Sequence, residues 1–224
     1  MFKQLLAILK RDDLIAQALQ DTENMFQKSA RLFTEACRAL EHNQQAGFDI
    51  YDLDKEINGL EKKIRRKILE HLSINPKQDI VASLVLTSIV ISIERIGDHA
   101  KNIYELIDLY EKDDEITIDP ILKESAAFIE TQFSKVQQAF SDGDQETAKT
   151  LMHTLDPVRQ TVDRYIFEEA AKKENCSARR TIVNVLYARF LKRVAAHLEN
   201  TASSISNPFD MIGFYKKGNQ PIDL

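Results

Sequence analysis

The sequence predicts an all-α protein made of two tandem, pseudo-symmetric three-helix bundles. Apolar residues recur at three- and four-residue steps through most of the 224-residue chain, which is the spacing of helices that bury one face. The chain has only 6 glycines and 5 prolines, too few turn residues for a many-stranded sheet. A pattern in the first half also recurs in the second, so one three-helix unit is expected to occur twice.

Turn residues divide this pattern into six helices. A polar break ends at Gly47, and Asn75-Pro76 stops the second helix. Asp119-Pro120 fits an N-cap followed by proline in the first turn, Asp142-Gly143-Asp144 is a turn signal, and Pro157 is a possible kink site in the fifth helix. The expected helices cover residues 12–42, 48–73, 78–112, 121–140, 145–173 and 178–205.

The chain accordingly divides into a first lobe over residues 1–112, a second lobe over 113–205 and a C-terminal tail over 206–224. Met1–Lys10 is expected to form a short amphipathic lead-in helix, because it is too short for a signal peptide and lacks a small-residue cleavage site. The tail is expected to be irregular and yet to dock on a lobe or a partner, because it is more apolar than a free tail needs. Its apolar residues are Phe209, Met211, Ile212, Phe214 and Tyr215.

Composition excludes several classes of function. The net charge is −5 and the basic residues are scattered, which argues against a nucleic-acid partner. The longest apolar run, Ile80–Ile93, has 14 residues, fewer than the roughly 18 to 20 that a membrane span requires. Cys37 and Cys176 match no metal or redox spacing and are expected to be free thiols. We therefore expect a cytoplasmic protein that reaches a membrane only through a partner.

The stretch Leu84–Tyr104 changes from a nearly all-apolar helix into a charged site. Its apolar half suits a helix that is buried on most of its circumference. Glu94 and Asp98 then lie four residues apart on one helix face, where like charges repel unless a cation or a basic group compensates them. Gly97 lies between them at a cost of roughly 1 kcal/mol relative to alanine, so we expect backbone or a ligand to approach closely there.

A second polar ridge lies on the preceding helix, where Asp54, Asn58 and Glu61 fall at positions i, i+4 and i+7. If these two helices pack antiparallel, the ridge meets Glu94 and Asp98. Four carboxylates and one amide would then converge, and such oxygen donors suit hard cations such as magnesium, manganese or calcium. The sequence therefore predicts a metal site at these five residues.

Two alternatives to this metal site remain open. Iron and zinc more often recruit imidazole, for which His99 is the nearby candidate. The acids could instead form surface ion pairs with Arg95, Lys55 or Lys62, in which case no metal is needed.

The third helix of each lobe carries the same scaffold with different acids. Ile93–Asn102 aligns with Leu191–Asn200 at an offset of 98 residues, and Leu53–Ile64 aligns with Leu155–Ile166 at an offset of 102. Lys192 then stands in the place of Glu94, where it could form a salt bridge with the remaining acids of the second lobe in place of a metal. We therefore predict one metal site in the first lobe and none, or a weak one, in the second. Ala196 stands in the place of Asp98, whereas the acids Asp156 and Asp163 of the second lobe remain. Three pairs of residues are the same in both lobes, and helix packing or capping is expected for them: Arg95 with Arg193, His99 with His197 and Asn102 with Asn200.

The string I-E-R-I-G-D-H-A-K-N-I at residues 93–103 and L-D-K-E-I-N-G-L-E at 53–61, with the tandem repeat, resemble the PhoU family of bacterial and archaeal phosphate-uptake regulators. The resemblance implies a symmetric, two-lobed, all-α protein that binds metal ions, often iron, in clusters on acidic motifs. It also implies repression of phosphate uptake through an ABC-type phosphate transporter and its sensor histidine kinase, without an established enzymatic activity. The second lobe departs from the family's acidic motif at Lys192 and Ala196.

Three functions follow from these observations. The first is a non-catalytic regulator of phosphate transport or signalling, expected to be a homodimer, whose iron, manganese, magnesium or zinc site is structural or sensing. The second is a metal-dependent enzyme, which the absence of a Glu-x-x-His pair and of a glycine-rich phosphate loop disfavours. The third is a metal-free interaction module. We favour the first, and expect no enzymatic activity.

Overall fold

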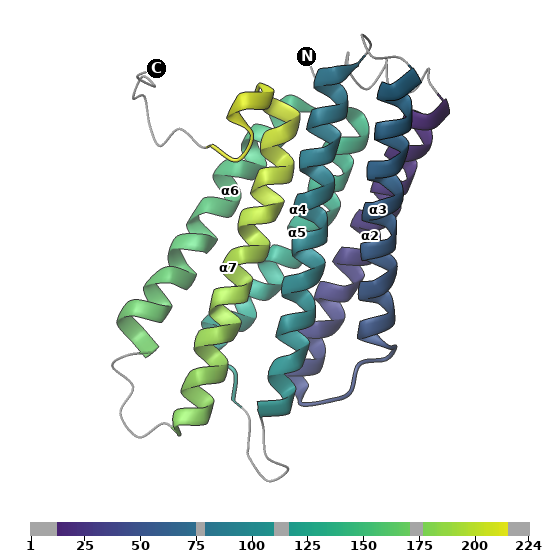
Figure 1. Cartoon of the computed structure of the whole chain (residues 1–224). Coiled ribbons are helices and arrows are strands. Elements are labelled where there is room, and N and C mark those ends of the chain that lie inside the picture. Colours follow the sequence, from purple (N-terminus) through teal and green to yellow (C-terminus); the bar gives the residue numbers. More distant parts are fainter. Residues whose placement is uncertain (1–12, 75–78, 110–116, 171–176, 215–224) are drawn as a thin grey trace.

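The computed structural model describes residues 13–74, 79–109, 117–170 and 177–214, and these ranges contain helices and no strand. The expected lead-in helix, the Asn75-Pro76 turn and Cys176 lie outside them. The all-α prediction is confirmed, and six long helices appear close to their expected positions (Figure 1). These are α2 (Asp13–His42), α3 (Ile50–Ile74), α4 (Ile80–Glu105), α5 (Pro120–Asp142), α6 (Gln145–Arg164) and α7 (Ala178–Ser206), with the short helices η1 (Leu106–Leu109), η2 (Tyr165–Glu169) and η4 (Phe209–Met211).

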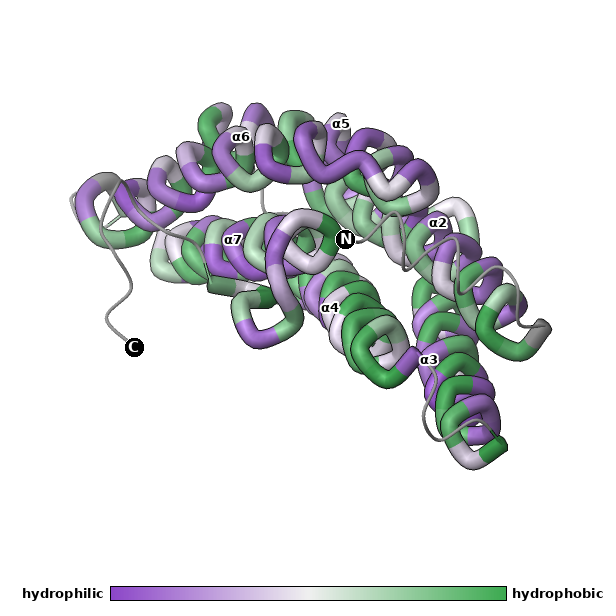
Figure 2. Tube along the Cα trace, turned by 90° about the horizontal axis from the view of Figure 1, so that it is seen from above, coloured by the Kyte–Doolittle hydropathy of each residue, from purple (hydrophilic) through white to green (hydrophobic). Residues whose placement is uncertain are grey.

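The helices form two layers. Seen from above, α6, α5 and α2 make one layer, and α7, α4 and α3 make the other (Figure 2). Each repeat contributes three mutually packed helices, α2 with α3 and α4, and α5 with α6 and α7. Helices α4 and α7 lie side by side and antiparallel at the centre of the second layer, so the repeats meet there (Figure 1). The tandem arrangement of two three-helix bundles is therefore confirmed.

One continuous cluster of buried side chains runs through both repeats. The Phe133 ring of α5 lies 5.3 Å from the Phe33 ring of α2, measured between centroids, and ties the first layer together. Segment Ile80–Leu109 is long and apolar enough to cross a membrane by length and composition, but 56% of its most apolar window is buried inside the bundle. Its central position explains the apolar composition, because α4 packs against α2, α3 and α7.

Helix ends follow the turn signals with one exception. Gly143 takes a φ of 65° after α5, and the Asp144 side chain caps α6 by accepting hydrogen bonds from the backbone N–H groups of Glu146 and Thr147. Pro120 begins α5 as expected, but the Asp119 carboxylate does not cap that helix. It accepts a hydrogen bond from the buried Tyr165 hydroxyl instead.

The C-terminal tail docks on α7 as far as the structure describes it. The backbone N–H of Gly213 donates to Ser203 Oγ at 2.9 Å, and Asn207 Nδ2 donates to the Met211 carbonyl at 3.2 Å. Ile212 packs against the core, whereas the Phe214 side chain is 65% exposed. The expected docking is confirmed for this part, although η4 makes the segment more regular than predicted; Tyr215 lies outside the described ranges.

Candidate functional site

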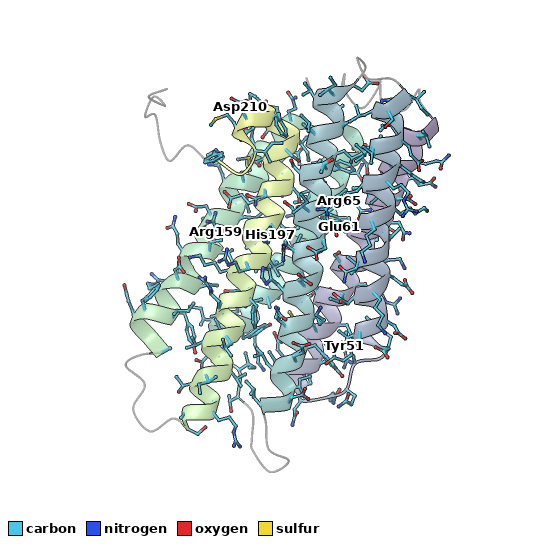
Figure 3. The ribbon with its side chains drawn as sticks, viewed as in Figure 1. Tyr51, Glu61, Arg65, Arg159, His197 and Asp210 are labelled. Carbon is cyan, nitrogen blue, oxygen red and sulfur yellow. The ribbon has the colours of Figure 1, made fainter. Side chains whose placement is uncertain are left out.

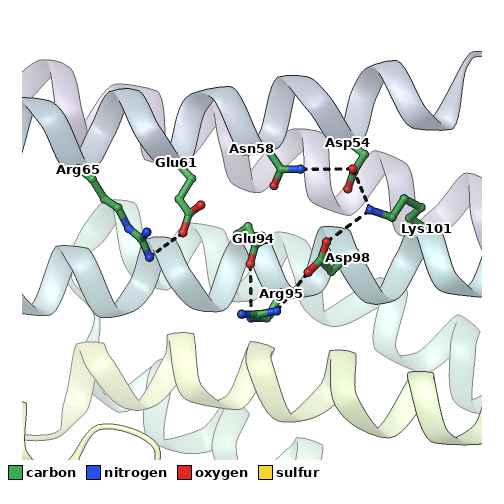
Figure 4. Close-up of polar contacts among 8 residues, drawn as sticks. All are labelled: Asp54, Asn58, Glu61, Arg65, Glu94, Arg95, Asp98 and Lys101. Carbon is green, nitrogen blue, oxygen red and sulfur yellow. Dashed lines mark hydrogen bonds and ion pairs between the residues drawn. The ribbon is translucent and has the colours of Figure 1, made fainter.

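The candidate site lies along the seam between α3 and α4, which Gly97 allows to be narrow. A Cβ atom at Gly97 would lie 3.2 Å from Cδ1 and 3.4 Å from Cγ2 of Ile57, whose side chain is fully buried. The close approach expected at Gly97 is therefore made by an α3 side chain. This contact sets the two polar ridges opposite each other (Figure 4).

Glu94 is the central acid of the seam, between Glu61 of α3 and Asp98 one turn further along α4 (Figure 4). The exposed fractions of the side chains are 14% for Glu94, 13% for Glu61 and 27% for Asp98. The pKa of Glu94 is raised to about 7, first by burial and then by the charges of Asp98 and Glu61, while Arg95 opposes the rise. The seam thus carries negative charge that its own cations do not fully compensate.

Asp54 anchors the other end of the seam. Its Oδ2 atom accepts a hydrogen bond from Lys101 Nζ at 2.9 Å and from Asn58 Nδ2 at 3.3 Å. The same ammonium lies 3.5 Å from Oδ1 of Asp98. Lys101 therefore occupies the space between the two acids and links α3 to α4.

Two arginines complete the network (Figure 4). Arg95 lies 3.3 Å from Asp98 Oδ2, through Nη1, and 3.5 Å from Glu94 Oε2, through Nε. Arg65 Nη2 lies 2.8 Å from Oε1 of Glu61. All five predicted site residues thus lie along one seam, and each of their carboxylates has a basic neighbour.

The expected ion-pair alternative was correct for Arg95 and wrong for Lys55, which pairs with Asp52 at 2.9 Å. Among the described residues, Lys62 pairs with none of the site acids. Sequence reasoning missed Lys101 and Arg65. The signal was present, because Lys101 lies three residues after Asp98 and Arg65 four residues after Glu61, on the same helix faces.

In the second repeat, basic side chains of the protein pair with acidic ones. Lys192 Nζ donates to Asp163 Oδ1 at 2.6 Å, which confirms the salt bridge expected there. Buried Glu199, at the position equivalent to Lys101, accepts a hydrogen bond from Arg159 of α6. Figure 3 places Arg159 and Glu61 on opposite sides of the central α4 and α7 helices. The two repeats therefore share a scaffold and differ in how charge is balanced on it.

A sequence profile of the PhoU domain matches residues 22–107 and 122–205. The chain belongs to the PhoU family. One curated relative, the phosphate-specific transport system accessory protein PhoU homolog 1 of Thermotoga maritima, is 31% identical over 100 residues, which span 43% of this chain and 42% of that protein.

Two solved PhoU structures share the fold. The phosphate transport system regulatory protein PhoU from Streptococcus pneumoniae superposes with a TM-score of 0.70 at 16% identity, covering 85% of this chain and 92% of that one. PhoU from Pseudomonas aeruginosa gives a TM-score of 0.61 at 19% identity, covering 92% and 97%.

The donors of this PhoU seam suit a hard cation by their chemistry. They are carboxylate and amide oxygens, and the pKa of Glu94 is raised first by burial and then by the negative charges of Asp98 and Glu61. Among the described residues, no three Asp, Glu, His or Cys side chains are already arranged as a metal site. A metal would therefore displace Lys101 and Arg95 from the carboxylates that they now contact.

The imidazole candidate His99 lies on a different side of α4. Its ring stacks on His197 of α7, with centroids 5.6 Å apart and planes 25° apart. Burial lowers the pKa of His99, and the nearby Arg193 lowers it further. The packing role expected for the repeated histidines is thus confirmed, and the donors at the acidic seam are oxygens.

Proposed function

We propose that this PhoU protein is a non-catalytic regulator of phosphate transport and phosphate-starvation signalling that acts through protein contacts and carries a metal site in its first repeat. Family membership supports the phosphate connection, as does the name of the Thermotoga maritima relative. The observation that carries the metal assignment is the crowding of Glu94 between Asp98 and Glu61 in one repeat, where the other repeat has Lys192.

The metal would be held by oxygen atoms from both helices of the seam. A magnesium or manganese ion suits carboxylates and amides best, and iron or zinc are the other candidates. When bound, the metal would supply positive charge where the seam has an excess of negative charge. The proposed ligands are Asp54, Asn58, Glu61, Glu94 and Asp98.

Metal binding at this seam is a competition with the protein's own cations. Lys101 and Arg95 already bridge acids of α3 and α4, so the ion must turn these side chains away. The helices are then joined by a tighter cross-link, and the displaced basic side chains change the charge of the exposed face. A partner that binds one of these two states better shifts their populations, as any ligand does.

The proposed partners are a phosphate ABC transporter and its sensor histidine kinase. The protein would be a cytoplasmic homodimer that meets the membrane through these partners. A second candidate function is a metal-free interaction module, which is favoured by the observation that Lys101 and Arg95 already neutralise part of the seam. Metal-dependent phosphoester hydrolysis is the third and least supported candidate.

Elemental analysis and partner capture on the same samples test this proposal. We expect the purified protein to contain enough metal to fill about one site per chain. The double variant Glu94→Ala, Asp98→Ala should lose both the metal and the binding of a transporter subunit. Lys149→Ala, which removes an exposed pair with Glu146 on α6, is the control. Loss of metal with unchanged partner affinity would establish the metal-free module instead. Phosphoester turnover on addition of manganese would establish an enzyme.

A further inference from the structure

A second charged cluster lies along the seam between α4 and α7 and meets the acidic seam at Arg95. It consists of Arg95 and His99 on α4 and Arg189, Arg193 and His197 on α7, and we call it the basic seam. Figure 4 shows Arg95 on the side of α4 that faces α7. This seam lies in the layer opposite α2, α5 and α6, and its three arginines are exposed (Figures 1 and 2).

The two histidines form a fixed centre for this seam. The His99 ring stacks on His197 at 5.6 Å and on Phe190 at 6.1 Å, with interplanar angles of 25° and 26°. Nδ1 of each histidine is buried without a hydrogen-bond partner among the described residues. The proton of each neutral ring is therefore best placed on Nε2, which makes that atom a hydrogen-bond donor.

The arginines extend from this centre along the helices. Arg189, Arg193 and His197 are spaced four residues apart on one ridge of α7, a rise of about 6 Å per step. Because α4 runs antiparallel to α7, Arg95 and Arg193 flank the histidine pair from opposite ends. The donors on α7 thus form a row about 12 Å long, with His99 and Arg95 of α4 beside it, and they do not converge on one point.

The positive charge of this row is largely unbalanced. Arg189 and Arg193 are exposed, and neither makes an ion pair with a carboxylate of the described residues. Arg95 has acidic neighbours at 3.3 Å and 3.5 Å, and the charge of Asp98 also acts on His99. The field also acts on His197, whose pKa is lowered to about 4 first by burial and then by His99, Arg193 and Arg95. This concentration of cations occurs in a chain with a net charge of −5.

We propose that the basic seam binds a chain of phosphate groups, either inorganic polyphosphate or the triphosphate of a nucleotide. Guanidinium groups bind phosphate oxygens through two parallel hydrogen bonds, and the histidine N–H groups add neutral donors between them. A linear polyphosphate places negative charge along the row, whereas a single phosphate reaches only one end of it. No proposed metal ligand belongs to the basic seam, but the two sites share Arg95, which a metal would release from Glu94 and Asp98; the binding test is therefore run without metal.

Calorimetric titration of chelator-treated protein with tripolyphosphate, ATP and orthophosphate tests this assignment. We expect tripolyphosphate to bind at least about tenfold more tightly than orthophosphate. Arg193→Gln and Arg189→Gln should each weaken tripolyphosphate binding by about tenfold or more, the size expected for a charged hydrogen bond. Both residues are exposed, so the variants should fold, and the unfolding temperature checks this.

Arg66→Gln is the matched control, because Arg66 is an exposed arginine on α3 without an ion pair among the described residues. It removes the same charge from the protein and should leave tripolyphosphate binding unchanged. ATP binding as tight as that of tripolyphosphate supports a nucleotide as the source, and binding of tripolyphosphate alone supports the inorganic chain. Equal effects of Arg66→Gln and Arg193→Gln, orthophosphate binding as tight as that of tripolyphosphate, or equally tight binding of a polyglutamate peptide would overturn the proposal.

Discussion

Lys192 Nζ lies 2.6 Å from Asp163 Oδ1, at the place where the first repeat sets Glu94 beside Glu61. Lys192 in place of Glu94 and Ala196 in place of Asp98 therefore separate a seam that neutralises itself from a seam with excess negative charge. The helices around both seams are equivalent, so the effect of this charge can be tested by exchanging it between repeats.

Lys192→Glu combined with Ala196→Asp should convert the second seam into a copy of the first. Without metal we expect the variant to be less stable by about 1 kcal/mol, because a partly exposed ion pair is lost and like charges face each other. Manganese should stabilise the variant by about 2.7 kcal/mol in total at a concentration of 100 times the dissociation constant, which more than offsets this loss. Urea unfolding with and without manganese measures both changes.

Lys149→Glu is the control for that exchange, since Lys149 pairs with Glu146 on an exposed turn of α6. It should lower stability slightly and leave the response to manganese as in the wild type. If the Lys192→Glu, Ala196→Asp variant gains no metal over the wild type, the acids alone do not specify the site.

Glu94→Gln should have opposite effects in the absence and presence of metal. In chelator-treated protein the amide removes a buried charge and its repulsion from Asp98 and Glu61, so the unfolding midpoint in urea should rise at pH 8 by an amount equivalent to about 1 kcal/mol. In the presence of manganese the same variant should lose most of the metal-dependent stabilisation. Glu56→Gln, at an exposed α3 acid paired with Lys28, should change neither. A lower midpoint for Glu94→Gln without metal would show that burial and repulsion of the Glu94 charge do not dominate at this seam.

The helices and the acidic ridge followed from sequence because both depend on regular spacing along one helix. Four-residue steps place Glu94 and Asp98 on one face, and the repeat offset identified Lys192 as the counterpart of Glu94. The partner of Asp54 did not follow. Lys101 of α4 reaches Asp54 across the contact between α3 and α4. The residue spacing along α3 does not predict which basic side chain of α4 comes within bonding distance.

Helix ends likewise depend on contacts that local sequence does not predict. Asp119 has the sequence signature of an N-cap, and the helix does begin at Pro120. Its carboxylate is nevertheless bonded to Tyr165, 46 residues away, because the two side chains are buried together. Long-range competition for a capping side chain is decided by packing, which local sequence signals do not contain.

The stacked His197 should make the protein sensitive to mild acid. The pKa of His197 in the folded state is about 4, below the unfolded value of about 6.5. The unfolded state therefore binds more protons between these values, and stability is lost as pH falls from 6.5 toward 4, by about 2 kcal/mol at pH 5. His197→Gln should flatten this part of the profile in urea unfolding series at pH 7.5, 6.5, 5.5 and 5.0.

The matched variant His42→Gln removes an exposed histidine at the end of α2 and should keep the wild-type pH profile. Each profile is compared as a slope, so a constant change in stability from lost ring stacking does not affect the reading. An unchanged slope in His197→Gln would mean that protonation of this ring does not oppose folding.

Gly97 and Gly59 are two helical glycines whose surroundings predict opposite results. A side chain at Gly97 meets the buried Ile57 at 3.2 Å, so Gly97→Leu should separate α3 from α4 and cost about 1–3 kcal/mol of stability. Nothing lies within 4 Å of a Cβ at Gly59, so Gly59→Leu should gain several tenths of a kcal/mol from helix propensity. Wider spacing of the ridges should also weaken manganese binding in Gly97→Leu only, which titration of the folded variants measures. Equal metal affinity in the two variants would mean that the narrow seam is not what brings the five oxygen donors together.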